Sequence, residues 1–357
     1  MVSKKIVMVL TAILVMSSFM VFVPMSSDET EAADGPFMIK DHWGREITFD
    51  APIEKIAVFG TAFAATVSDL GYLDSIVMAD TYSIAALDDL DLDKGYSFTT
   101  EFDAIGQRLN DNEGGFDKDR DAVVIYGYAS YEAGRDKLAN EYGLKVIGMY
   151  PSNFDNTIDC VKTIGKLYGI AENDNSAAKD MERAKTYFTD ELSKNGITDD
   201  KKVPVVYVGY TSSNFTAGND ASFTASLIRL AGGVNAASDS SKGSSYAIAP
   251  GDIELMGAEI VFLDGNYSKS VAEFRSEMHI SSDVKIYQLG KTMNTYAPSA
   301  YDGIKLMASA MYPDIFGDID DNGEGFLQDS MWYIVAAICV ILLIVVVVIV
   351  VRRGKTI

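Results

Sequence analysis

The sequence predicts a membrane-anchored α/β protein in which two Rossmann-like lobes are joined by a long helical spine and enclose a cleft. Two observations indicate the lobes: short apolar runs alternate with helical periodicity in two series, and a helix-rich stretch without strand-like runs separates these series. Strands that alternate with helices pair in parallel and form sheets covered on both faces. A third observation, an apolar segment near each end, places the lobes between a signal sequence and a membrane anchor.

The two ends of the chain carry the targeting signals. Lys4 and Lys5 precede an apolar run, which is typical of a signal sequence over residues 1–27, but the poor cleavage motif at 30–32 leaves open that it stays as an anchor. Residues 331–351 are almost entirely apolar and long enough to span a bilayer. Because the tail 352–357 is basic, it is expected to be cytoplasmic. The predicted product is a single-pass protein of the cell membrane with an extracellular ectodomain.

The ectodomain is strongly acidic. Five of the 30 basic residues lie in the signal and the tail, which leaves 25 Lys and Arg against 51 Asp and Glu, a net charge of −26. Such a surface repels phosphate backbones, so nucleic acid is not an expected partner. Cys160 and Cys339 are the only cysteines, and the second lies in the predicted membrane segment. No intramolecular disulfide is therefore expected.

The N-terminal lobe is predicted over residues 37–152. Two extended runs around a Gly-containing turn within 37–49 indicate a hairpin. The alternation that follows predicts strands at 55–59, 75–79, 121–126 and 145–149, with helices at 62–70 and 130–142.

The remainder of the ectodomain is predicted as a spine and a second lobe. Helix formers dominate residues 153–195, which predicts a continuous helical spine with only Gly165 and Gly169 as interruptions. The C-terminal lobe is expected over residues 203–316, followed by an acidic linker at 317–330. Its predicted strands are 203–208, 259–263 and 284–289, and its predicted helices are 222–230, 270–278 and 300–312.

Catalytic and metal chemistry have little support in the sequence. His42 and His279 are the only histidines, and no G-x-S-x-G elbow is present, so the protein is not predicted to be an enzyme. Both are expected to be ordinary surface residues, which argues against a His-rich metal site. No cofactor is expected. One acidic segment partly fits a calcium loop, with a solvated linker as the alternative. Its candidate ligands are Asp318, Asp320, Asn322 and Asp329.

Aromatic and small polar side chains gather in segments that follow the predicted strands. Tyr, Asn and Ser supply rigid contact area and hydrogen bonds, a composition typical of a recognition surface for a sizeable ligand. The alternative is that a chain with 19 tyrosines places some of them in loops regardless of function. The ligand-binding candidates are Thr61, Phe63, Tyr82, Tyr126, Tyr128, Tyr210, Ser212, Asn214, Phe215, Tyr246, Asn266, Tyr267 and Tyr296. Asn214 and Asn266 also begin glycosylation sequons, whose use is left open.

Five segments carry a resemblance to a known family. Residues 41–49 (DHWGREITF) are similar to a D-x-x-G-R-x-V-x-hydrophobic start, and residues 52–58 resemble a P-x-R-I-V-V strand. Residues 71–77 resemble L-G-x-x-D-x-I-V-G, while 215–218 and 230–235 together match F-T-A-G followed by L-A-G-G-x-N. In this order, over about residues 37–316, they resemble the helical-spine solute-binding proteins of ABC importers for iron-siderophores, haem and cobalamin.

This resemblance implies a ligand and partners. The expected function is capture of a metal chelate or corrinoid and its delivery to an ABC permease with its ATPase. The family pattern places permease-docking acids at Glu113 and at Asp252 or Glu254. The stretch 85–109 is longer and more acidic than the family's usual connection. The predicted anchor is a membrane helix and not a lipid, which suits a cell with one membrane, such as an archaeon. A surface sensor or adhesin with the same fold is the alternative, and an anchored hydrolase is a weaker one.

Overall fold

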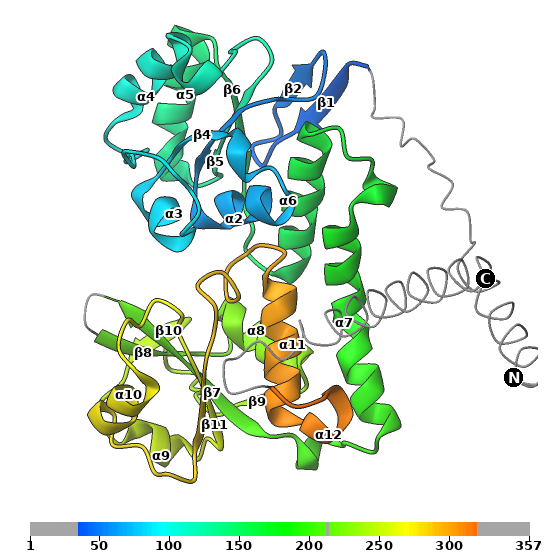
Figure 1. Cartoon of the computed structure of the whole chain (residues 1–357), viewed down its shortest axis with the longest axis vertical. Coiled ribbons are helices and arrows are strands. Elements are labelled where there is room, and N and C mark those ends of the chain that lie inside the picture. Colours follow the sequence, from blue (N-terminus) through cyan, green and yellow to red (C-terminus); the bar gives the residue numbers. More distant parts are fainter. Residues whose placement is uncertain (1–34, 212–213, 320–357) are drawn as a thin grey trace, which may run out of the picture.

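The computed structural model describes residues 35–211 and 214–319, which form two α/β lobes arranged one above the other (Figure 1). The predicted signal sequence and membrane segment lie outside these residues, as do four candidate site residues. Those four are Ser212, Asp320, Asn322 and Asp329. Within the described part of the chain, no helix is both long and apolar enough to cross a membrane.

The N-terminal lobe contains the predicted hairpin and a four-stranded parallel sheet in the order β4-β3-β5-β6. Its strands are β1 (Phe37–Lys40), β2 (Glu46–Phe49), β3 (Ile56–Phe59), β4 (Ile76–Ala79), β5 (Ala122–Tyr126) and β6 (Lys145–Met149). Its helices are α2 (Thr61–Asp69), α3 (Thr81–Ala86), α4 (Phe102–Asn110) and α5 (Glu132–Tyr142). The strands and the two helices predicted from the alternation are confirmed. Helix α3, just before the long acidic stretch, and helix α4, at its end, were not predicted.

Both faces of this sheet are buried, which explains its nearly continuous apolar strands. Along β3, Ile56 and Val58 join one hydrophobic core, while Ala57 and Phe59 join the core on the opposite face. Successive side chains of a strand point to opposite sides, so only a sheet covered by helices on both faces buries all four.

The C-terminal lobe holds a six-stranded mixed sheet in which β10-β8-β7-β11-β12 are neighbours and β9 pairs with β7. Its strands are β7 (Pro204–Thr211), β8 (Asn214–Gly218), β9 (Val234–Asn235), β10 (Ser245–Ala247), β11 (Ile260–Leu263) and β12 (Lys285–Gln288). Its helices are α8 (Phe223–Leu230), α9 (Asp252–Met256), α10 (Val271–Glu277), α11 (Ala300–Met311) and α12 (Pro313–Phe316). The prediction of parallel pairing is wrong for β8, which runs antiparallel to β7 and β10. Residues 214–218 were expected in a loop, but backbone pairing with β7 makes them a strand.

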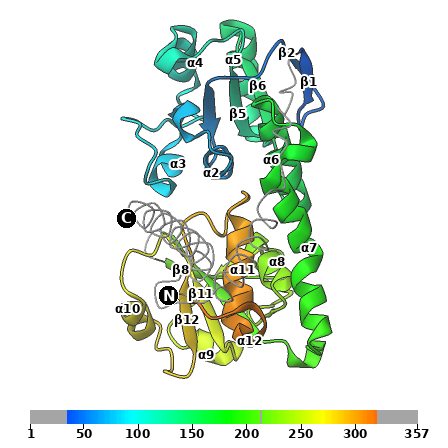
Figure 2. The same cartoon turned by 45° about the vertical axis from the view of Figure 1, so that its right-hand side comes forward.

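The expected single spine helix is also wrong, because the structure has two helices, α6 (Phe154–Leu167) and α7 (Ser176–Lys194). Gly169 adopts a left-handed conformation with φ of 77°, and this ends α6. Asn175 then caps α7 by accepting a hydrogen bond from the backbone N–H of Ala178 at 3.0 Å. Figure 2 shows both helices on the same side of the molecule.

Helix α6 contributes side chains to the cores of both lobes. Ile158 and Val161 pack into the core that contains α7, α8 and α11, whereas Ile164 and Leu167 pack into the core of the N-terminal lobe. Since one rigid helix contributes to both cores, movement of the lobes relative to each other is opposed by packing.

Candidate ligand-binding cleft

A cavity of about 470 Å³ opens at the carboxyl ends of β3, β4 and β5. Helices α2 and α3, which begin at this edge of the sheet, lie on the side of the N-terminal lobe that faces the second lobe (Figure 1). In an α/β sheet this edge is where ligands bind, because the loops after the strands meet there. The lining residues are Phe59, Gly60, Thr61, Asp80, Thr81, Tyr82, Tyr96, Ser97, Phe98, Thr99, Tyr126 and Tyr131. Three of the predicted ligand-binding residues, Thr61, Tyr82 and Tyr126, are therefore brought together.

Gly60 shapes the wall of this cavity between β3 and α2. Its φ is 152°, and a Cβ at this position would lie 2.5 Å from the ring of Tyr126 and 2.9 Å from Phe63. Only glycine allows this backbone to pass so close to an aromatic ring. Thr61 therefore enters the first turn of α2 directly beside Tyr126.

Asp80 supplies the cavity's one charged side chain among its lining residues. It is the N-cap of α3 and accepts hydrogen bonds from the backbone N–H groups of Tyr82 at 2.9 Å and Ser83 at 3.0 Å, and from the Ser83 hydroxyl at 2.7 Å. Capping explains why a carboxylate is tolerated at this half-buried position. The sequence interpretation did not single out Asp80.

Aromatic rings form one continuous side of the cavity. Tyr131 lies 5.1 Å from Phe98 and 5.7 Å from Tyr128 between ring centroids, and Tyr126 lies 5.0 Å from Tyr128. Burial raises the pKa of Tyr126 and, together with the charge of Asp80, that of Tyr131. Both phenols are therefore neutral at physiological pH and can donate hydrogen bonds to a ligand.

A second aromatic group spans the back of the cleft, beside α6. Tyr296, in the segment after β12, packs against Phe223 of α8 with centroids 4.1 Å apart, and Phe223 packs against Phe154 of α6 at 6.4 Å. Burial raises the pKa of Tyr296, and the neighbouring hydroxyls of Tyr128 and Tyr150 raise it further. The predicted residues Tyr128 and Tyr296 thus approach each other from opposite lobes.

Direct polar contacts join the lobes at the edge of the cleft. The backbone N–H of Ser299 donates to the Asp69 carboxylate at 2.8 Å, and the Lys291 ammonium pairs with Asp88 at 2.6 Å. Lys291 also donates to the carbonyl of Ala85 at 3.4 Å. The segment between β12 and α11 therefore bridges to α2 and to the residues after α3.

In the C-terminal lobe, a buried carboxylate positions two predicted residues. Asp264 follows β11 and accepts hydrogen bonds from the Tyr207 hydroxyl at 3.0 Å and the Tyr210 backbone N–H at 3.3 Å. It also accepts the backbone N–H and the side-chain amide of Asn266, both at 2.9 Å. Burial and the charge of Asp264 raise the pKa of Tyr207 well above its ordinary value.

The remaining predicted ligand-binding residues lie either inside a lobe or on strands. Phe63 and Tyr267 are only 1 % and 2 % exposed, so their prediction as ligand contacts is corrected: both rings pack inside their lobes. Tyr267 also donates its hydroxyl to Glu277 at 3.1 Å. Asn214, Phe215 and Tyr246 lie on the strand pair β8 and β10 and not in loops.

Several residues beside the cleft were missed by sequence reasoning. Tyr96 and Phe98 belong to the long acidic stretch, which showed no recognisable motif, although a bridge between Asp80 and Tyr96 brings it to β4. His42 is exposed in the turn of the hairpin, as expected, and its ring lies 5.0 Å from that of Tyr150. Its backbone N–H also donates to Gly148 at 2.8 Å, so the hairpin turn is held against β6.

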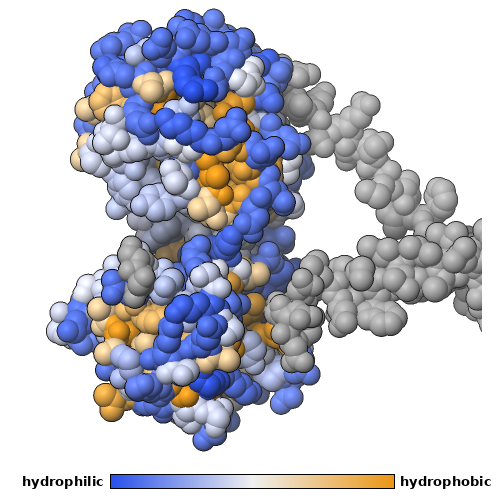
Figure 3. Space-filling view, turned by 60° about the vertical axis from the view of Figure 1, so that its left-hand side comes forward, coloured by the Kyte–Doolittle hydropathy of each residue, from blue (hydrophilic) through white to orange (hydrophobic). Residues whose placement is uncertain are grey.

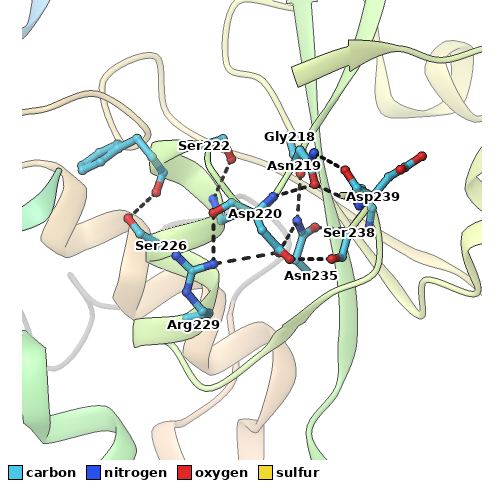
Figure 4. A network of polar contacts seen from close by, with 12 residues as sticks. Gly218, Asn219, Asp220, Ser222, Ser226, Arg229, Asn235, Ser238 and Asp239 are labelled. Atoms are coloured by element: carbon cyan, nitrogen blue, oxygen red, sulfur yellow. Dashed lines mark hydrogen bonds and ion pairs between the residues drawn. The ribbon is translucent and has the colours of Figure 1, made fainter. Parts of the chain in front are cut away.

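A polar network beneath β8 explains two of the motifs behind the family resemblance (Figure 4). The amide of buried Asn219 donates to the carbonyls of Asp239 at 2.7 Å and Gly243 at 2.8 Å, and Asn235 donates to the carbonyl of Gly218 at 3.0 Å. These bonds hold the segment 236–244 onto β8 and α8. The network is structural, and it keeps β8 and β10 paired at the rim of the cleft.

The three predicted docking acids lie at the surface and each makes an internal contact. Glu113 pairs with Arg108, Asp252 accepts the backbone N–H of Ala249 at 2.8 Å, and Glu254 accepts that of Ser281 at 2.6 Å.

Among the described residues, no group of three or more His, Cys, Asp or Glu side chains could hold a metal ion. Of the calcium candidates only Asp318 is described, and it is exposed.

Two α/β lobes, parallel strands that end at an aromatic cleft and a helix shared by both cores define the class: this is the fold of the periplasmic solute-binding proteins. Figure 3 shows the narrow waist between the lobes from the side, with hydrophobic residues exposed beside it on the upper lobe. The fold predicted from the resemblance is thus present, including the long helix α7.

Comparison with known proteins supports this class through structure alone. No family model matches the chain, and no curated protein does. The periplasmic solute binding protein of Veillonella parvula DSM 2008 is similar with a TM-score of 0.61 and 16% identity over 83% of this chain and 91% of its own. Molybdate-bound MolA of Haemophilus influenzae has a TM-score of 0.62 and 14% identity over 80% of this chain and 94% of its own. A periplasmic heme binding protein from Pseudomonas aeruginosa has a TM-score of 0.55 and 14% identity over 73% and 94%.

Proposed function

We propose that the chain is the substrate-binding protein of an ABC importer, anchored at the outer face of the cell membrane by residues 331–351. It captures a metal chelate or corrinoid, of the iron-siderophore, haem or cobalamin type, and delivers it to the permease. The observation that carries this proposal is the aromatic cavity at the carboxyl edge of β3, β4 and β5, open toward the second lobe of a binding-protein fold.

The size and composition of the cleft suit a ligand larger than a single ion. A cavity of about 470 Å³ falls within the range of small-molecule sites, and its mixture of rings and hydroxyl groups offers both apolar contact and hydrogen bonds. A corrinoid or ferric siderophore would place one edge in this cavity and extend toward Tyr128 and Tyr296. The known structures with this fold include proteins for haem and for molybdate, so the fold by itself does not select the ligand.

Ligand binding by the full chain in detergent tests this function directly. Ferric siderophores, haem and cobalamins are titrated while quenching of tryptophan and tyrosine fluorescence is recorded. We expect one class to bind, and Tyr296→Ala to weaken that binding because Tyr296 lies close to Tyr128 of the other lobe. Tyr187→Ala on α7, which removes another partly buried ring that does not line the cavity, is the matched control. Absence of binding by all three classes would overturn the proposed ligand class.

The permease is expected to recognise the rims of both lobes. One carboxylate on each lobe, Glu113 on the first and Asp252 or Glu254 on the second, would orient the protein across a symmetric transporter by pairing with its arginines. Leu255, which is 87 % exposed, adds apolar area beside Asp252 and Glu254. Replacing Glu113 and Asp252 with their amides should slow uptake, most clearly at low salt, without changing ligand affinity. Normal uptake by this variant, and by one that also carries Glu254→Gln, would refute the docking assignment.

A further inference from the structure

We propose that the cavity in the N-terminal lobe receives a positively charged group of the ligand, an alkylammonium or quaternary ammonium, and discriminates against anionic ligands. This inference rests on the proposed function and narrows its ligand class. Three features of the cavity support it: the charge of its wall, the unused hydrogen-bonding capacity of Asp80 and the aromatic rings that line it.

The wall of the cavity is negatively charged. Asp80 is its one ionised lining residue, and neither Lys nor Arg lines it among the residues that the structure describes. The nearest cations, Lys94 and Arg108, lie against the ring of Tyr96 at 4.4 and 5.7 Å. Each is neutralised by its own carboxylate, since Lys94 pairs with Glu101 at 2.9 Å and Arg108 with Glu113. An anionic group that entered the cavity would therefore meet an uncompensated carboxylate.

Asp80 can still accept a bond from a ligand. One of its oxygens accepts the two backbone N–H groups of Tyr82 and Ser83, and the other accepts only the Ser83 hydroxyl. A carboxylate offers about four acceptor sites, so the second oxygen retains one. Helix capping holds this carboxylate in place, which makes it a preformed partner for a cation.

Aromatic rings line the cavity beside Asp80, among them Phe98, Tyr126 and Tyr131. Tyr131 lies 5.1 Å from Phe98 and meets Tyr126 at an interplanar angle of 67°, so these rings do not form one flat stack. A cation held at the face of a ring gains about 0.5 to 2 kcal/mol depending on desolvation. The phenols of Tyr126 and Tyr131 stay neutral, so they add donors without adding charge.

The proposal is tested with a pair of probes of equal shape. Choline and its neutral isostere 3,3-dimethylbutan-1-ol are titrated into the full chain by calorimetry, with molybdate as an oxyanion probe. We expect choline to bind about tenfold more tightly than the isostere, a difference equivalent to about 1.4 kcal/mol, and molybdate not to bind at this site. Equal binding of choline and the isostere, no binding of choline, or binding of molybdate that competes with choline would each overturn the proposal.

Variants separate charge and ring effects from folding. Asp80→Asn keeps a good N-cap and should reduce choline affinity about tenfold while leaving the isostere unchanged. Tyr131→Phe should retain binding and Tyr131→Leu should lose most of it, because only the ring face is required. Asp190→Asn, an exposed acid on α7, removes the same charge far from the cavity and should have no effect. If Asp80→Asn binds choline as tightly as the unaltered chain, the assignment is wrong.

Failure of the charge preference can be distinguished from failure of the proposed transport function. Binding of haem, a cobalamin or a ferric siderophore without any preference for choline would leave the transport function intact and remove the charge preference. Binding of choline without any chelate would instead replace the chelate class by small organic cations.

Discussion

The two polar contacts between the lobes should control how far the lobes separate. Ser299 donates its backbone N–H to Asp69, and Lys291 pairs with Asp88. Asp69 thereby accepts from the N-terminus of α11 although it belongs to α2 of the other lobe. The double variant Asp69→Asn with Lys291→Gln weakens both contacts without removing buried apolar area.

The expected magnitude follows from the exposure of the four groups. The side chains of Asp88 and Lys291 are 79% and 35% exposed, so their ion pair contributes only about 0.5 kcal/mol. The charged hydrogen bond at Asp69 belongs to a stronger class, but partial exposure reduces it to about 1 kcal/mol. Together they favour the observed arrangement by about 1.5 kcal/mol, which is about a tenfold change in the population of separated lobes.

Single-molecule distance measurements can detect this change. Dyes attached through Asn140→Cys on α5 and Leu255→Cys on α9, in a chain that also carries Cys339→Ser, report the distance between the lobes, while buried Cys160 stays unlabelled. The double variant should broaden the distance distribution toward longer values. Lys269→Gln, which breaks an ion pair with Glu277 inside the C-terminal lobe, is the matched control. An unchanged distribution in the double variant would refute the reasoning and leave the packing of α6 as the sole determinant.

Three further predictions concern stability and reactivity. Gly148→Ala would place a Cβ 1.9 Å from the Trp43 ring, so the free energy of unfolding measured by denaturant titration should fall by about 3 kcal/mol. An unchanged unfolding midpoint would contradict the packing of Trp43 on Gly148. Asn219→Ala should lower the free energy of unfolding by about 2 kcal/mol and expose the segment 236–244 to proteolysis, because the carbonyls of Asp239 and Gly243 lose the buried amide that donates to them. Proteolytic resistance equal to that of the unaltered chain would count against the network. Burial raises the pKa of the Cys160 thiol to about 12, so Cys160 should be alkylated slowly at about pH 8 in the native protein, as measured by peptide mapping. An alkylation rate equal to that of the denatured chain would show that this thiol is not buried.

The sequence was sufficient to predict the strands whose side chains are buried on both faces of the sheet. The strand 56–59 is apolar throughout and is followed by Gly60, a pattern that few other structures produce. The strands β8 and β10 were not predictable in the same way. Their polar residues Asn214 and Ser245 are exposed, and their extended conformation depends on antiparallel pairing with a neighbour and not on local preference. The break between α6 and α7 was visible only as Gly169, whose backbone conformation is set by the fold.

The site was predictable where a candidate follows a strand directly. Thr61 and Tyr126 were found because β3 and β5 end beside them. Tyr96 and Phe98 were not, since no strand or motif marks their segment and they reach the cavity through a single bridge to Asp80. A long-range contact of this kind leaves no periodic signal in the sequence.

The two carboxylates at the strand ends show why position alone does not define a binding residue. Asp80 follows β4 and Asp264 follows β11, so each stands at the carboxyl edge of its own sheet. Asp264 accepts four hydrogen bonds, from Tyr207, Tyr210 and twice from Asn266, which uses the whole capacity of a carboxylate. It is 7% exposed and serves to fix the loops after β7 and β11. Asp80 accepts three, all from within its own helix cap, and opens into a cavity. The difference in unused acceptor capacity, and not the shared topology, assigns ligand recognition to Asp80 and architecture to Asp264.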